Sequence, residues 1–404
     1  MSSTKFETYS KYKISGFKWL GKIPEHWELE RLGKKLKERK VKVSDKDYPP
    51  LSVTKQGILP QIATAAKSND GENRKLVRKG DFVINSRSDR KGSSGIAKTD
   101  GSVSLINIVL KLNGIFPNYC NYLLKSNSFV EEFYRMGHGI VADLWTTRYD
   151  EMKNIKTAFP PKQEQTRIAN FLDRKCEQID KAIELKQRLI ELLKERRQII
   201  IQNAVTRGLK PNVKLKDSGV EWIGKIPEHW EVKRLKYITF LKSGETISYG
   251  DFTEDGYPVY GGNGFRGYTT TYTNEGEHIL IGRQGALCGN INYAKGKFFA
   301  SEHAIVVYPL NNESILWLGE AMDAANLNRF SQSAAQPGIA VNIIKNEQFP
   351  YPPLKEQYTI SKYLEKQFSK ITKAVNYQQT QIDKLKEYKS VLIDSAVTGK
   401  IKVS

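Results

Sequence analysis

The sequence contains one structural frame twice. The stretch 16–32 reads GFKWLGKIPEHWELERL, and 219–235, which begins 203 residues later, reads GVEWIGKIPEHWEVKRL. The motif P-K-Q-E-Q at Pro161–Gln165 returns 192 residues later as P-L-K-E-Q at Pro353–Gln357. Self-similarity of this kind means that one unit of structure occurs more than once. We therefore predict two copies of one architecture, related by an internal pseudo-two-fold repeat.

Each copy ends in a stretch with the pattern of a long helix. Residues 162–204 contain no Pro and no Gly and are rich in residues that favour helices. Eight apolar positions of this stretch are apolar again 192 residues later, and their spacing keeps one narrow stripe on one helix face, as a coiled-coil seam requires. Besides Ala204 and Ala396, the positions predicted to pack the two helices together are Ile168, Leu172, Ile179, Ile183, Ile190, Leu193, Ile200, Ile360, Leu364, Ile371, Val375, Ile382, Leu385 and Leu392.

The sequence also marks both ends of each helix. We expect the helices to begin just after Pro161 and Pro353 and to stop at Gly208 and Gly399. At 1.5 Å per residue each is about 60 Å long, so a pair would form a rigid spacer between two globular domains. The second helix must return toward the start, which favours an antiparallel pair within one chain. Pairing of each helix with another subunit is the alternative.

The segments between the constant parts, roughly 33–158 and 236–350, show no similarity to each other. Short strand-like runs alternate with turns and a few helical stretches, which predicts the α/β (α+β) class with mixed, irregular sheets. A constant frame with two unlike inserts indicates one architecture that presents two different surfaces. Strands are expected within Pro50–Thr54, Asp81–Asn85, Val103–Lys111, Pro258–Tyr268, His278–Tyr293 and Ala304–Pro309, and helices at 119–135 and Leu316–Ala325.

The charge indicates a polyanionic partner. Lys and Arg total 64 against 44 Asp and Glu, a net charge of +20, which is typical of proteins that bind nucleic acid or an anionic membrane surface. The excess is uneven, because residues 28–161 hold 24 Lys and Arg against 15 Asp and Glu, whereas 231–353 hold 10 against 12. No apolar run is long enough for a membrane span, and the start lacks the apolar core of a signal peptide. Cys120, Cys176 and Cys288 lie too far apart for a disulfide framework or a zinc site, so we expect a reducing cytoplasm.

Loops in each insert have the chemistry of nucleic-acid contacts. Ser86–Gly95 combines cations with small hydroxyls and glycine, so it can approach phosphates and reach base edges. Pro258–Tyr268 interleaves aromatic residues with Gly, Asn and Arg, and a second short loop lies between Gly282 and Gly285. Ordinary solvent-exposed turns are the alternative interpretation. The candidate DNA-binding residues are Lys55, Gln56, Ser86, Arg87, Arg90, Lys91, Ser93, Ser94, Tyr260, Asn263, Phe265, Arg266, Tyr268, Arg283 and Gln284.

Motifs of catalysis are missing or weak. The sequence has no phosphate-cradling G-x-x-x-x-G-K-[ST], no G-x-G-x-x-G after a strand, and no [DNS]-P-P-[YFW] of the kind expected in an adenine methyltransferase. Asp81 with D-x-K at Asp89–Lys91 could hold a nuclease metal ion, but D-x-K is common in any basic chain. His26 and His229 stand in the repeated E-H-W block beside Trp and Pro, which favours packing over catalysis. We predict no catalytic residue and no metal site.

The ordered set of motifs resembles the specificity subunit of type I restriction–modification systems. The block G-x-x-W-[LI]-G-x-I-P-x-H-W heads each half, P-P-x-x-E-Q opens each long helix, and A-V-T lies near each helix end at Ala204–Thr206 and Ala396–Thr398. The resemblance covers essentially the whole chain. The segments F-V-I-N-S in the first insert and I-L-I-G-R-Q-G in the second also look like parts of the target recognition domains of this family.

The resemblance implies two target recognition domains, each reading one half of a split DNA sequence, joined by two antiparallel helices that set the spacing. Residues 1–161 would then hold the N-terminal segment and the first recognition domain, 162–207 the first helix, 208–353 the second recognition domain, and 354–404 the second helix and the tail. The family also implies a non-catalytic chain that binds double-stranded DNA and two modification subunits. Those subunits methylate adenine with S-adenosylmethionine, and restriction subunits join them and use ATP with Mg to translocate and cleave DNA. The chain itself is expected to bind no cofactor.

Overall fold

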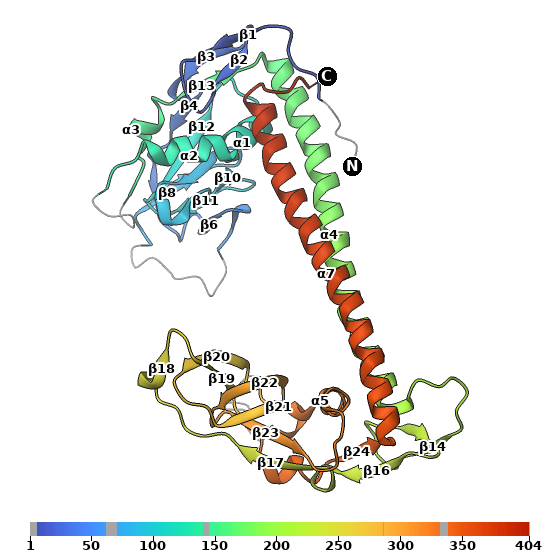
Figure 1. The fold of residues 1–404 in the computed structure, drawn as a ribbon. Helices are drawn as coiled ribbons and strands as arrows, with labels where there is room; N and C mark the ends of the chain where they lie inside the picture. The colour runs from blue at the N-terminus through green and yellow to red at the C-terminus, as the bar shows by residue number, and fades with distance from the viewer. Residues whose placement is uncertain (1–5, 62–70, 140–144, 286, 332–337, 404) are drawn as a thin grey trace. The chain divides into compact units, whose positions relative to one another are not determined.

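A computed structural model describes residues 6–61, 71–139, 145–285, 287–331 and 338–403 of the chain. Helices, short strands and several small sheets alternate along it, and two helices are far longer than the others (Figure 1). This mixed composition with irregular sheets confirms the predicted fold class.

The chain forms two compact units, and each contains part of both long helices. Unit 1 consists of Met1–Lys186 together with Thr380–Ser404, and unit 2 consists of Gln187–Gln379. The long helices are α4 (Lys162–Arg207) and α7 (Leu354–Val397). The helices therefore cross from one unit into the other, whereas the sequence suggested a division at the helix ends.

Both long helices end at glycines in the left-handed region. Gly208 follows α4 with φ +72° and Gly399 follows α7 with φ +75°, a backbone conformation that side chains with a Cβ disfavour. In unit 1, Lys389 Nζ of α7 bonds the carboxylate of Asp180 on α4 at 2.7 Å. In unit 2, the Arg197 guanidinium of α4 lies 4.0 Å from the ring centroid of Phe368 on α7. The residue number on α7 decreases from 389 to 368 as the residue number on α4 increases from 180 to 197. The two helices are therefore antiparallel.

The seam positions predicted from the sequence lie toward the interior of both units. Five of them belong to the hydrophobic core of unit 1, namely Ile168, Leu172, Ile179, Leu385 and Leu392. Ile360 and Leu364 belong to the core of unit 2. Ile371 and Ile382 are buried as well. Ile183, Ile190, Leu193, Ile200 and Val375 are half-buried.

Unit 1 builds its recognition segment from two small sheets and three short helices (Figure 1). The four-stranded sheet has the order β10-β9-β12-β4, with bounds Ser94–Ile96, Phe82–Asn85, Asn107–Leu112 and Leu36–Glu38. The three-stranded sheet has the order β11-β8-β5, with bounds Gly101–Val103, Arg74–Val77 and Lys42–Val43. A hairpin is formed by β6 (Leu51–Thr54) and β7 (Gly57–Pro60), and the helices are α1 (Pro117–Lys125), α2 (Asn127–Arg135) and α3 (Tyr149–Met152).

Two expectations for this segment were wrong in detail. The helix predicted at 119–135 is two helices, because Ser126 is extended at ψ 144° and its Oγ accepts the Phe129 N–H that opens α2. The strand predicted at Val103–Lys111 is two strands, β11 and β12, separated by a turn at 104–106. Local propensity predicts both stretches as continuous, and a capping serine or a tight turn interrupts them.

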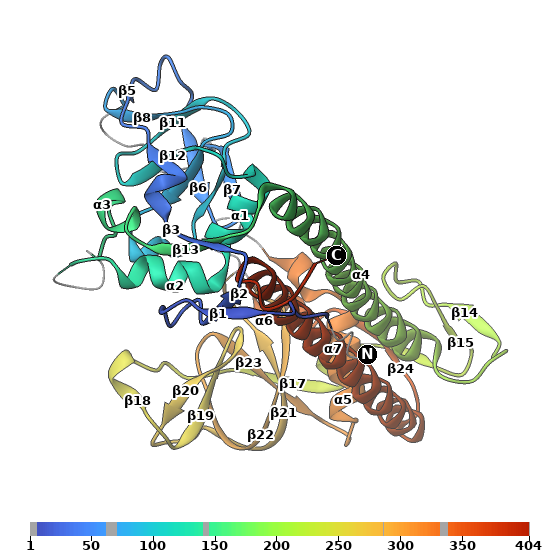
Figure 2. The same ribbon diagram turned by 90° about the horizontal axis from the view of Figure 1, so that it is seen from above.

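Unit 2 carries its recognition segment on one seven-stranded sheet of order β17-β23-β21-β22-β19-β20-β18 (Figure 2). Its strands in that order are Thr239–Ser243, Ala304–Pro309, Asn274–Gly282, Ile291–Ala300, Tyr257–Gly261, Gly264–Thr269 and Phe252–Thr253. β19 and β22 pair in parallel and their other neighbours are antiparallel, so the sheet is mixed, as predicted. The helices α5 (Ile315–Ala324) and α6 (Val341–Ile344) complete it, and Trp317 and Leu318 of α5 belong to the same core as Ile279 and Ile281.

Short strand pairs build the constant frame around both recognition segments. In unit 1, β1 pairs with β2 and β3 with β13, and in unit 2, β14 pairs with β15 and β16 with β24. Their bounds are Tyr12–Ile14, Lys22–Pro24, Glu28–Arg31 and Lys156–Phe159 in unit 1, and Leu215–Asp217, Lys225–Pro227, Glu231–Arg234 and Gln348–Tyr351 in unit 2. The two sets correspond one to one, which is the structural form of the sequence repeat.

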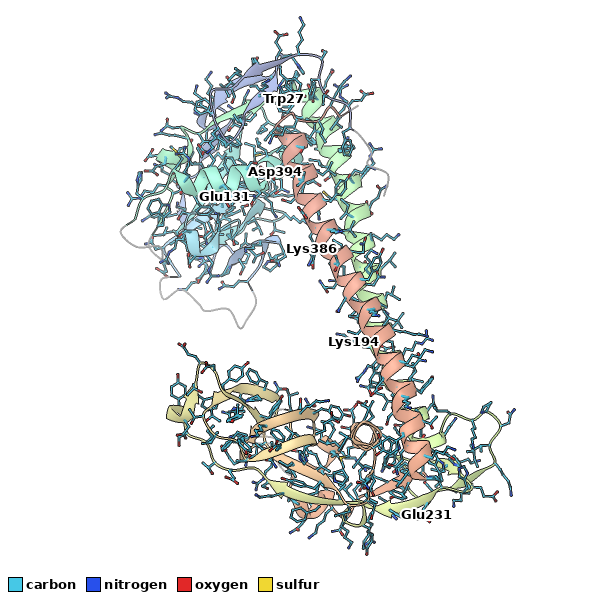
Figure 3. The ribbon with its side chains drawn as sticks, viewed as in Figure 1. Trp27, Glu131, Lys194, Glu231, Lys386 and Asp394 are labelled. Atoms are coloured by element: carbon cyan, nitrogen blue, oxygen red, sulfur yellow. The ribbon has the colours of Figure 1, made fainter. Side chains whose placement is uncertain are left out.

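In unit 1 the repeated E-H-W block holds the start of α4. Trp27, marked in Figure 3, is fully buried, and its Nε1 donates to Glu164 Oε1 at 3.1 Å. His26 Nε2 lies 2.8 Å from the other oxygen of this carboxylate, and the Tyr9 hydroxyl donates to Oε1 at 2.5 Å. Glu164 is the Glu of the P-x-x-E-Q motif. Two motifs that lie far apart in the sequence thus form one joint.

Unit 2 repeats this joint. Trp230 is fully buried, and its Nε1 donates to Glu356 Oε2 at 2.9 Å, while His229 Nε2 lies 2.8 Å from Oε1 of the same carboxylate. Both histidines therefore hold a structural carboxylate, and they accompany buried indoles as the sequence indicated. The joint requires a Trp, a His and a Glu at fixed positions, which explains why these residues recur in both copies of the repeat.

The same indoles also contact the ends of the opposite helices. A Cβ at Gly399, just after α7, would come within 3.3 Å of the Trp27 ring, and one at Gly208, just after α4, within 3.1 Å of the Trp230 ring. In unit 1 the block therefore contacts the start of α4 and the end of α7, and in unit 2 the start of α7 and the end of α4.

The Gln of P-x-x-E-Q attaches each recognition segment to its helix. Gln165 Oε1 accepts the N–H of Phe116, the N-cap of α1, at 2.9 Å. Gln357 Oε1 accepts the N–H of Ser314, the N-cap of α5, at 3.1 Å. These bonds satisfy N–H groups that a helix start leaves without an internal partner. This Gln contact is thus the same in both units, although the helices it holds belong to unlike domains.

Candidate nucleic-acid interface

The predicted loop after β9 in unit 1 carries its cations at the surface. Arg90 and Lys91 expose 68% and 41% of their side chains. Lys91 Nζ pairs with Glu131 Oε2 at 2.7 Å, and Figure 3 marks Glu131 on α2. Asp89 lies within 3.8 Å of the Arg87 guanidinium and 3.7 Å of that of Arg90. The loop is cationic on balance, but part of its charge is already paired within the unit.

The three serines of this loop are not surface residues. Ser86, Ser93 and Ser94 are 5%, 5% and 0% exposed. The Ser86 hydroxyl donates to the Ile106 carbonyl at 2.5 Å, which ties the loop to the turn between β11 and β12. Burial leaves these residues little surface for the phosphate contacts that the sequence suggested. Small polar residues beside glycine are typical of both a ligand loop and a tightly packed turn, and only packing separates the two.

Lys55 and Gln56 form the turn of the β6–β7 hairpin. Both side chains are exposed, and the Lys55 carbonyl accepts a hydrogen bond from Lys125 Nζ at 3.0 Å. That bond connects the hairpin turn to the end of α1. The two side chains are accessible to a ligand, and the bond from Lys125 holds the backbone of the turn in place.

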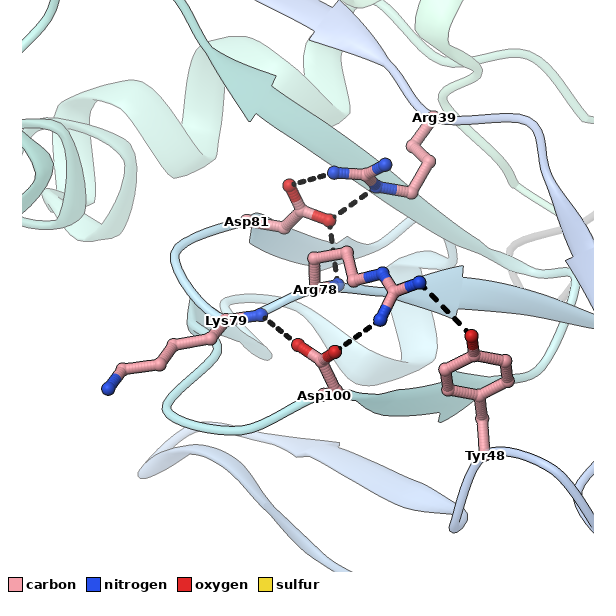
Figure 4. A network of polar contacts seen from close by, with 6 residues as sticks. All are labelled: Arg39, Tyr48, Arg78, Lys79, Asp81 and Asp100. Atoms are coloured by element: carbon pink, nitrogen blue, oxygen red, sulfur yellow. Dashed lines mark hydrogen bonds and ion pairs between the residues drawn. The ribbon is translucent and has the colours of Figure 1, made fainter.

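Asp81, one of the two acids considered for a nuclease, is engaged in a structural network that also contains Asp100 (Figure 4). Arg39 holds Asp81 through two bonds of 2.6 and 2.9 Å, and the backbone N–H of Arg78 donates to the same carboxylate at 2.9 Å. Asp100 accepts from the Lys79 N–H at 2.8 Å and from the Arg78 guanidinium, and these bonds hold the pKa of Asp100 below its ordinary value. A bidentate Arg–carboxylate pair leaves Asp81 little freedom to bind a metal. Across the described residues, no cluster of three His, Cys, Asp or Glu side chains could hold a metal ion.

Unit 2 presents aromatic side chains on the β19–β20 hairpin. Asn263 occupies the turn, and Phe265 and Tyr268 are 54% and 38% exposed with ring centroids 5.1 Å apart. Tyr260 is half-buried and meets Phe265 edge to face at 6.4 Å. The Arg266 guanidinium lies 5.6 Å from an aromatic ring of β18. Exposed rings beside one cation are suited to stacking and to apolar contact with bases rather than to dense phosphate contact.

The second predicted loop of unit 2 lies against this hairpin. A Cβ at Gly262, in the hairpin turn, would come within 2.9 Å of the Gln284 carbonyl and 3.2 Å of the His303 carbonyl. Gln284 Oε1 lies 2.9 Å from His303 Nδ1, and the Arg283 N–H donates to the His303 carbonyl at 2.8 Å. The structure thus brings together two groups that the sequence predicted separately. It also adds His303, for which a lone histidine in the sequence offered no signal.

Unit 1 contains a cationic cleft that the sequence did not indicate. The cleft encloses about 630 Å³, and the exposed apolar residues Leu105 and Ile106 form part of its wall. Its residues come from five separate stretches of the chain, and apart from Ser86 and Arg87 none was a candidate. No local pattern could have grouped them, although the excess of Lys and Arg in residues 28–161 is a signal of their presence. The cations of the lining are Lys40, Lys42, Lys75, Arg87 and Arg148.

A buried carboxylate connects α5 to α4 in unit 2. Glu320 is 3% exposed, and burial raises its pKa to about 7 against the opposing effect of Arg197. The Tyr293 hydroxyl donates to Glu320 Oε1 at 3.0 Å, and Arg197 lies 3.7 Å from the same oxygen. Burial also raises the pKa of the neighbouring Asp323. This group anchors the recognition segment to α4.

The chain is similar to known proteins of one family. Residues 227–384 match the family described as "Type I restriction modification DNA specificity domain". The EcoprrI specificity subunit of Escherichia coli is 38% identical over 159 residues, and this alignment spans 38% of each chain. The MjaVIII specificity subunit of Methanocaldococcus jannaschii is 24% identical over 97% of each chain. A solved chain from work on the assembly and conformational transition of the type I R-M system covers 93% of this chain and 98% of its own length, with a TM-score of 0.73 and 16% identity.

Residues 227–384 belong to the type I restriction–modification specificity domain family, and the chain as a whole is similar to specificity subunits. The fold is shared with the solved chain, and the family match lies in unit 2 and the adjoining part of α7. The matched region begins inside the second repeated block, W-I-G-K-I-P-E-H-W at 222–230. The two joints described above repeat the same contacts within this chain, and the surfaces of its two recognition segments differ. None of the helices in the described ranges is both long and apolar enough to span a bilayer.

Proposed function

We propose that this chain is the DNA-recognition subunit of a type I restriction–modification complex and works in the cytoplasm. Each recognition segment reads one half of a bipartite DNA sequence, and the chain itself performs no catalysis. The observation that carries this proposal is the repeated joint, in which Trp27 with Glu164, and Trp230 with Glu356, hold two unlike domains to one helix pair. A frame that is kept while its two inserts differ in surface suits two readers of different sequences.

The test is a map of methylated adenines in a host that carries this chain and its modification subunits. We expect one bipartite sequence with a fixed gap, absent from a host in which this chain is deleted. Methylation at unrelated single sites, or none at all, would contradict the proposal. Robust methyl transfer or Mg²⁺-dependent cleavage by the purified chain alone would instead favour an enzyme, and a complex without a sequence-specific footprint would favour a structural adaptor.

The long helices also offer a surface for the modification subunits. On α4, Leu189, Leu192 and Ile199 are 41%, 45% and 60% exposed, and their spacing places them on one face beside the seam. Exposed apolar stripes of this kind are typical of helix–helix contacts with a partner. We propose that two modification subunits, which bring S-adenosylmethionine, dock on the helix pair, and that restriction subunits with ATP and Mg join them.

Leu192→Asp tests this docking surface. We expect the variant to lose co-purification with the modification subunits at least tenfold, because a carboxylate in an apolar interface is costly to desolvate. Its melting temperature should stay unchanged, since Leu192 is exposed in the free chain. Lys194→Asp places the same charge on the other flank of the seam and serves as the control, and Figure 3 marks Lys194 on α4. Equal loss in both variants would contradict this docking surface.

The helix pair is also proposed to set the gap between the half-sites. Removing residues 187–193 of α4 together with 373–379 of α7 shortens each helix by seven residues and keeps the seam in phase. Seven residues span about 10 Å of helix, so we expect the preferred gap to shorten by roughly three base pairs at about 3.4 Å each. An unchanged gap in the methylation map would show that the helices do not determine the spacing.

A further inference from the structure

We propose that the cationic cleft of unit 1 binds the sugar–phosphate backbone of one DNA half-site, and that Leu105 and Ile106 at its wall contact the adjoining base edges. This inference rests on the proposed function and deepens it, because it assigns a place and a chemistry to the first recognition segment. Its main residues lie outside the loop that the sequence suggested.

The lining of the cleft carries an excess of positive charge. Five cations line it, against two carboxylates, Glu38 and Asp150. Glu38 lies 3.3 Å from Lys75 and 3.6 Å from Lys40, and Asp150 bonds Lys153 at 2.6 Å. Both acids are therefore already engaged by lysines, whereas Lys42 and Arg148 are exposed. The lining keeps an excess of positive charge that suits a polyanion.

The wall of the cleft includes two exposed apolar side chains on one turn. Leu105 and Ile106, 41% and 43% exposed, stand on the turn between β11 and β12. The Ser86 hydroxyl holds the Ile106 carbonyl, and the Asn107 side chain donates to the carbonyl and hydroxyl of Ser104 at 3.2 and 3.0 Å. Lys75 Nζ donates to the Asn107 carbonyl at 2.8 Å. The turn is fixed from several sides, so the two apolar side chains are presented without a large cost of ordering.

Leu105 and Ile106 are apolar side chains on a fixed turn, and cations surround them. This arrangement suits DNA better than a protein partner. Cations position the backbone, and an apolar side chain beside them reads thymine methyl groups or inserts against a base step. Buried Ser86 gains a role in this arrangement, because it shapes the turn from inside. The loop cations Arg87 and Arg148 then border the same cleft from two different segments.

The salt dependence of DNA binding tests the cleft. The complex with modification subunits is titrated with DNA that carries the target sequence found in the methylation map. The titration is repeated over a range of salt concentrations, for the wild type and for Lys42→Ala/Arg148→Ala. We expect the slope of log K against log salt to become shallower by about 1.8, since each phosphate contact contributes about 0.9. The control is Lys98→Ala/Lys111→Ala, two exposed lysines of unit 1 that are not part of the cleft lining, and its slope should stay that of the wild type.

Ile106→Ala supplies a second readout that charge alone would not move. We expect discrimination at one half-site to fall about fivefold or more, with the other half-site and the salt slope unchanged, because an apolar base contact carries sequence information and no charge. An unchanged preference would overturn the assignment of the turn.

The outcomes separate the inference from the proposed function. An unaltered slope in Lys42→Ala/Arg148→Ala, or the same change in the control pair, would overturn the cleft while specific binding by the wild type stands. Failure of this variant to assemble with modification subunits would identify the cleft as a protein interface and also overturn it. A wild-type complex without any sequence-specific binding would instead refute the proposed function.

Discussion

The two units share a joint and differ in what the joint supports. In both, a buried indole and a histidine hold the Glu of P-x-x-E-Q at the start of a long helix. Unit 1 then presents a cationic cleft, and unit 2 presents exposed aromatic side chains on a hairpin. The difference teaches that the frame depends on a few buried polar contacts, whereas the surfaces depend on side chains that the frame does not constrain.

Even the joint is not identical in detail. Trp222 Nε1 of unit 2 donates to Glu347 Oε1 at 2.9 Å. The position that corresponds to Glu347 in unit 1 is Ile155, and Trp19 Nε1 is buried with no partner among the described residues. An indole contributes packing in both places, so the shape of the joint survives the loss of one hydrogen bond.

The largest expected difference between the units concerns the joint carboxylates. Glu164→Ala should lower the free energy of unfolding by about 2–4 kcal/mol, because it leaves the buried Trp27 indole and the half-buried Tyr9 hydroxyl without an acceptor and removes the partner of His26. Glu356→Ala should cost about 1–2 kcal/mol, since that side chain is 28% exposed and water can replace it. Urea unfolding of the full chain measures both. Equal losses would show that burial does not distinguish the two joints.

The next effect concerns pH and belongs to unit 2. The folded pKa of Glu320, about 7, lies above its ordinary value of 4.5, so the folded state binds this proton more tightly than the unfolded state. The free energy of unfolding should therefore fall as pH rises from about 4.5 to about 7, by at most on the order of 3 kcal/mol, and change no further above that range.

Glu320→Gln should remove this part of the pH dependence and leave a more stable chain at pH 8. Urea unfolding between about pH 5 and pH 8 provides the measurement. Unit 1 ties its segment to α4 through the Tyr122 hydroxyl and Asp173 Oδ1, at 2.7 Å, in a more exposed setting. Asp173→Asn is therefore the matched variant, and it should keep the wild-type pH profile. A Glu320→Gln chain with that profile would show that another group titrates.

The smallest expected effect tests the difference in surface charge. Arg87→Ala and Lys91→Ala in unit 1 should each flatten the salt slope of DNA binding more than Arg266→Ala in unit 2, by up to about 0.9 per lost phosphate contact. Arg266 lies by an aromatic ring in a segment with 10 Lys and Arg against 12 Asp and Glu, so we expect it to act through a base contact. Titration of the full complex at several salt concentrations measures the slopes. Equal slopes would show that net charge per segment is a poor guide to phosphate contacts.

The sequence predicted the frame well for a physical reason. A long amphipathic helix is encoded locally, by periodicity, by the prolines before it and by the glycine after it, so the ends of α4 and α7 could be read from the letters. Repetition added the information that Trp27 and Trp230 do one job. The helix predicted at 119–135 failed because one serine, Ser126, caps a second helix there, a choice that propensity alone does not resolve.

The candidate site was harder to predict, because a surface is assembled from distant segments. Arg90 and Phe265 are exposed as expected, but Ser93 and Ser94 are buried, and Lys42, Leu105 and Arg148 meet at one cleft from three stretches of the chain. By itself the sequence determined the duplicated frame, the long helices and the family resemblance, since these depend on local pattern and on repetition. Only the tertiary structure decided which polar side chains face inward and which cations share a surface, because burial and proximity follow from packing between segments that no local pattern connects.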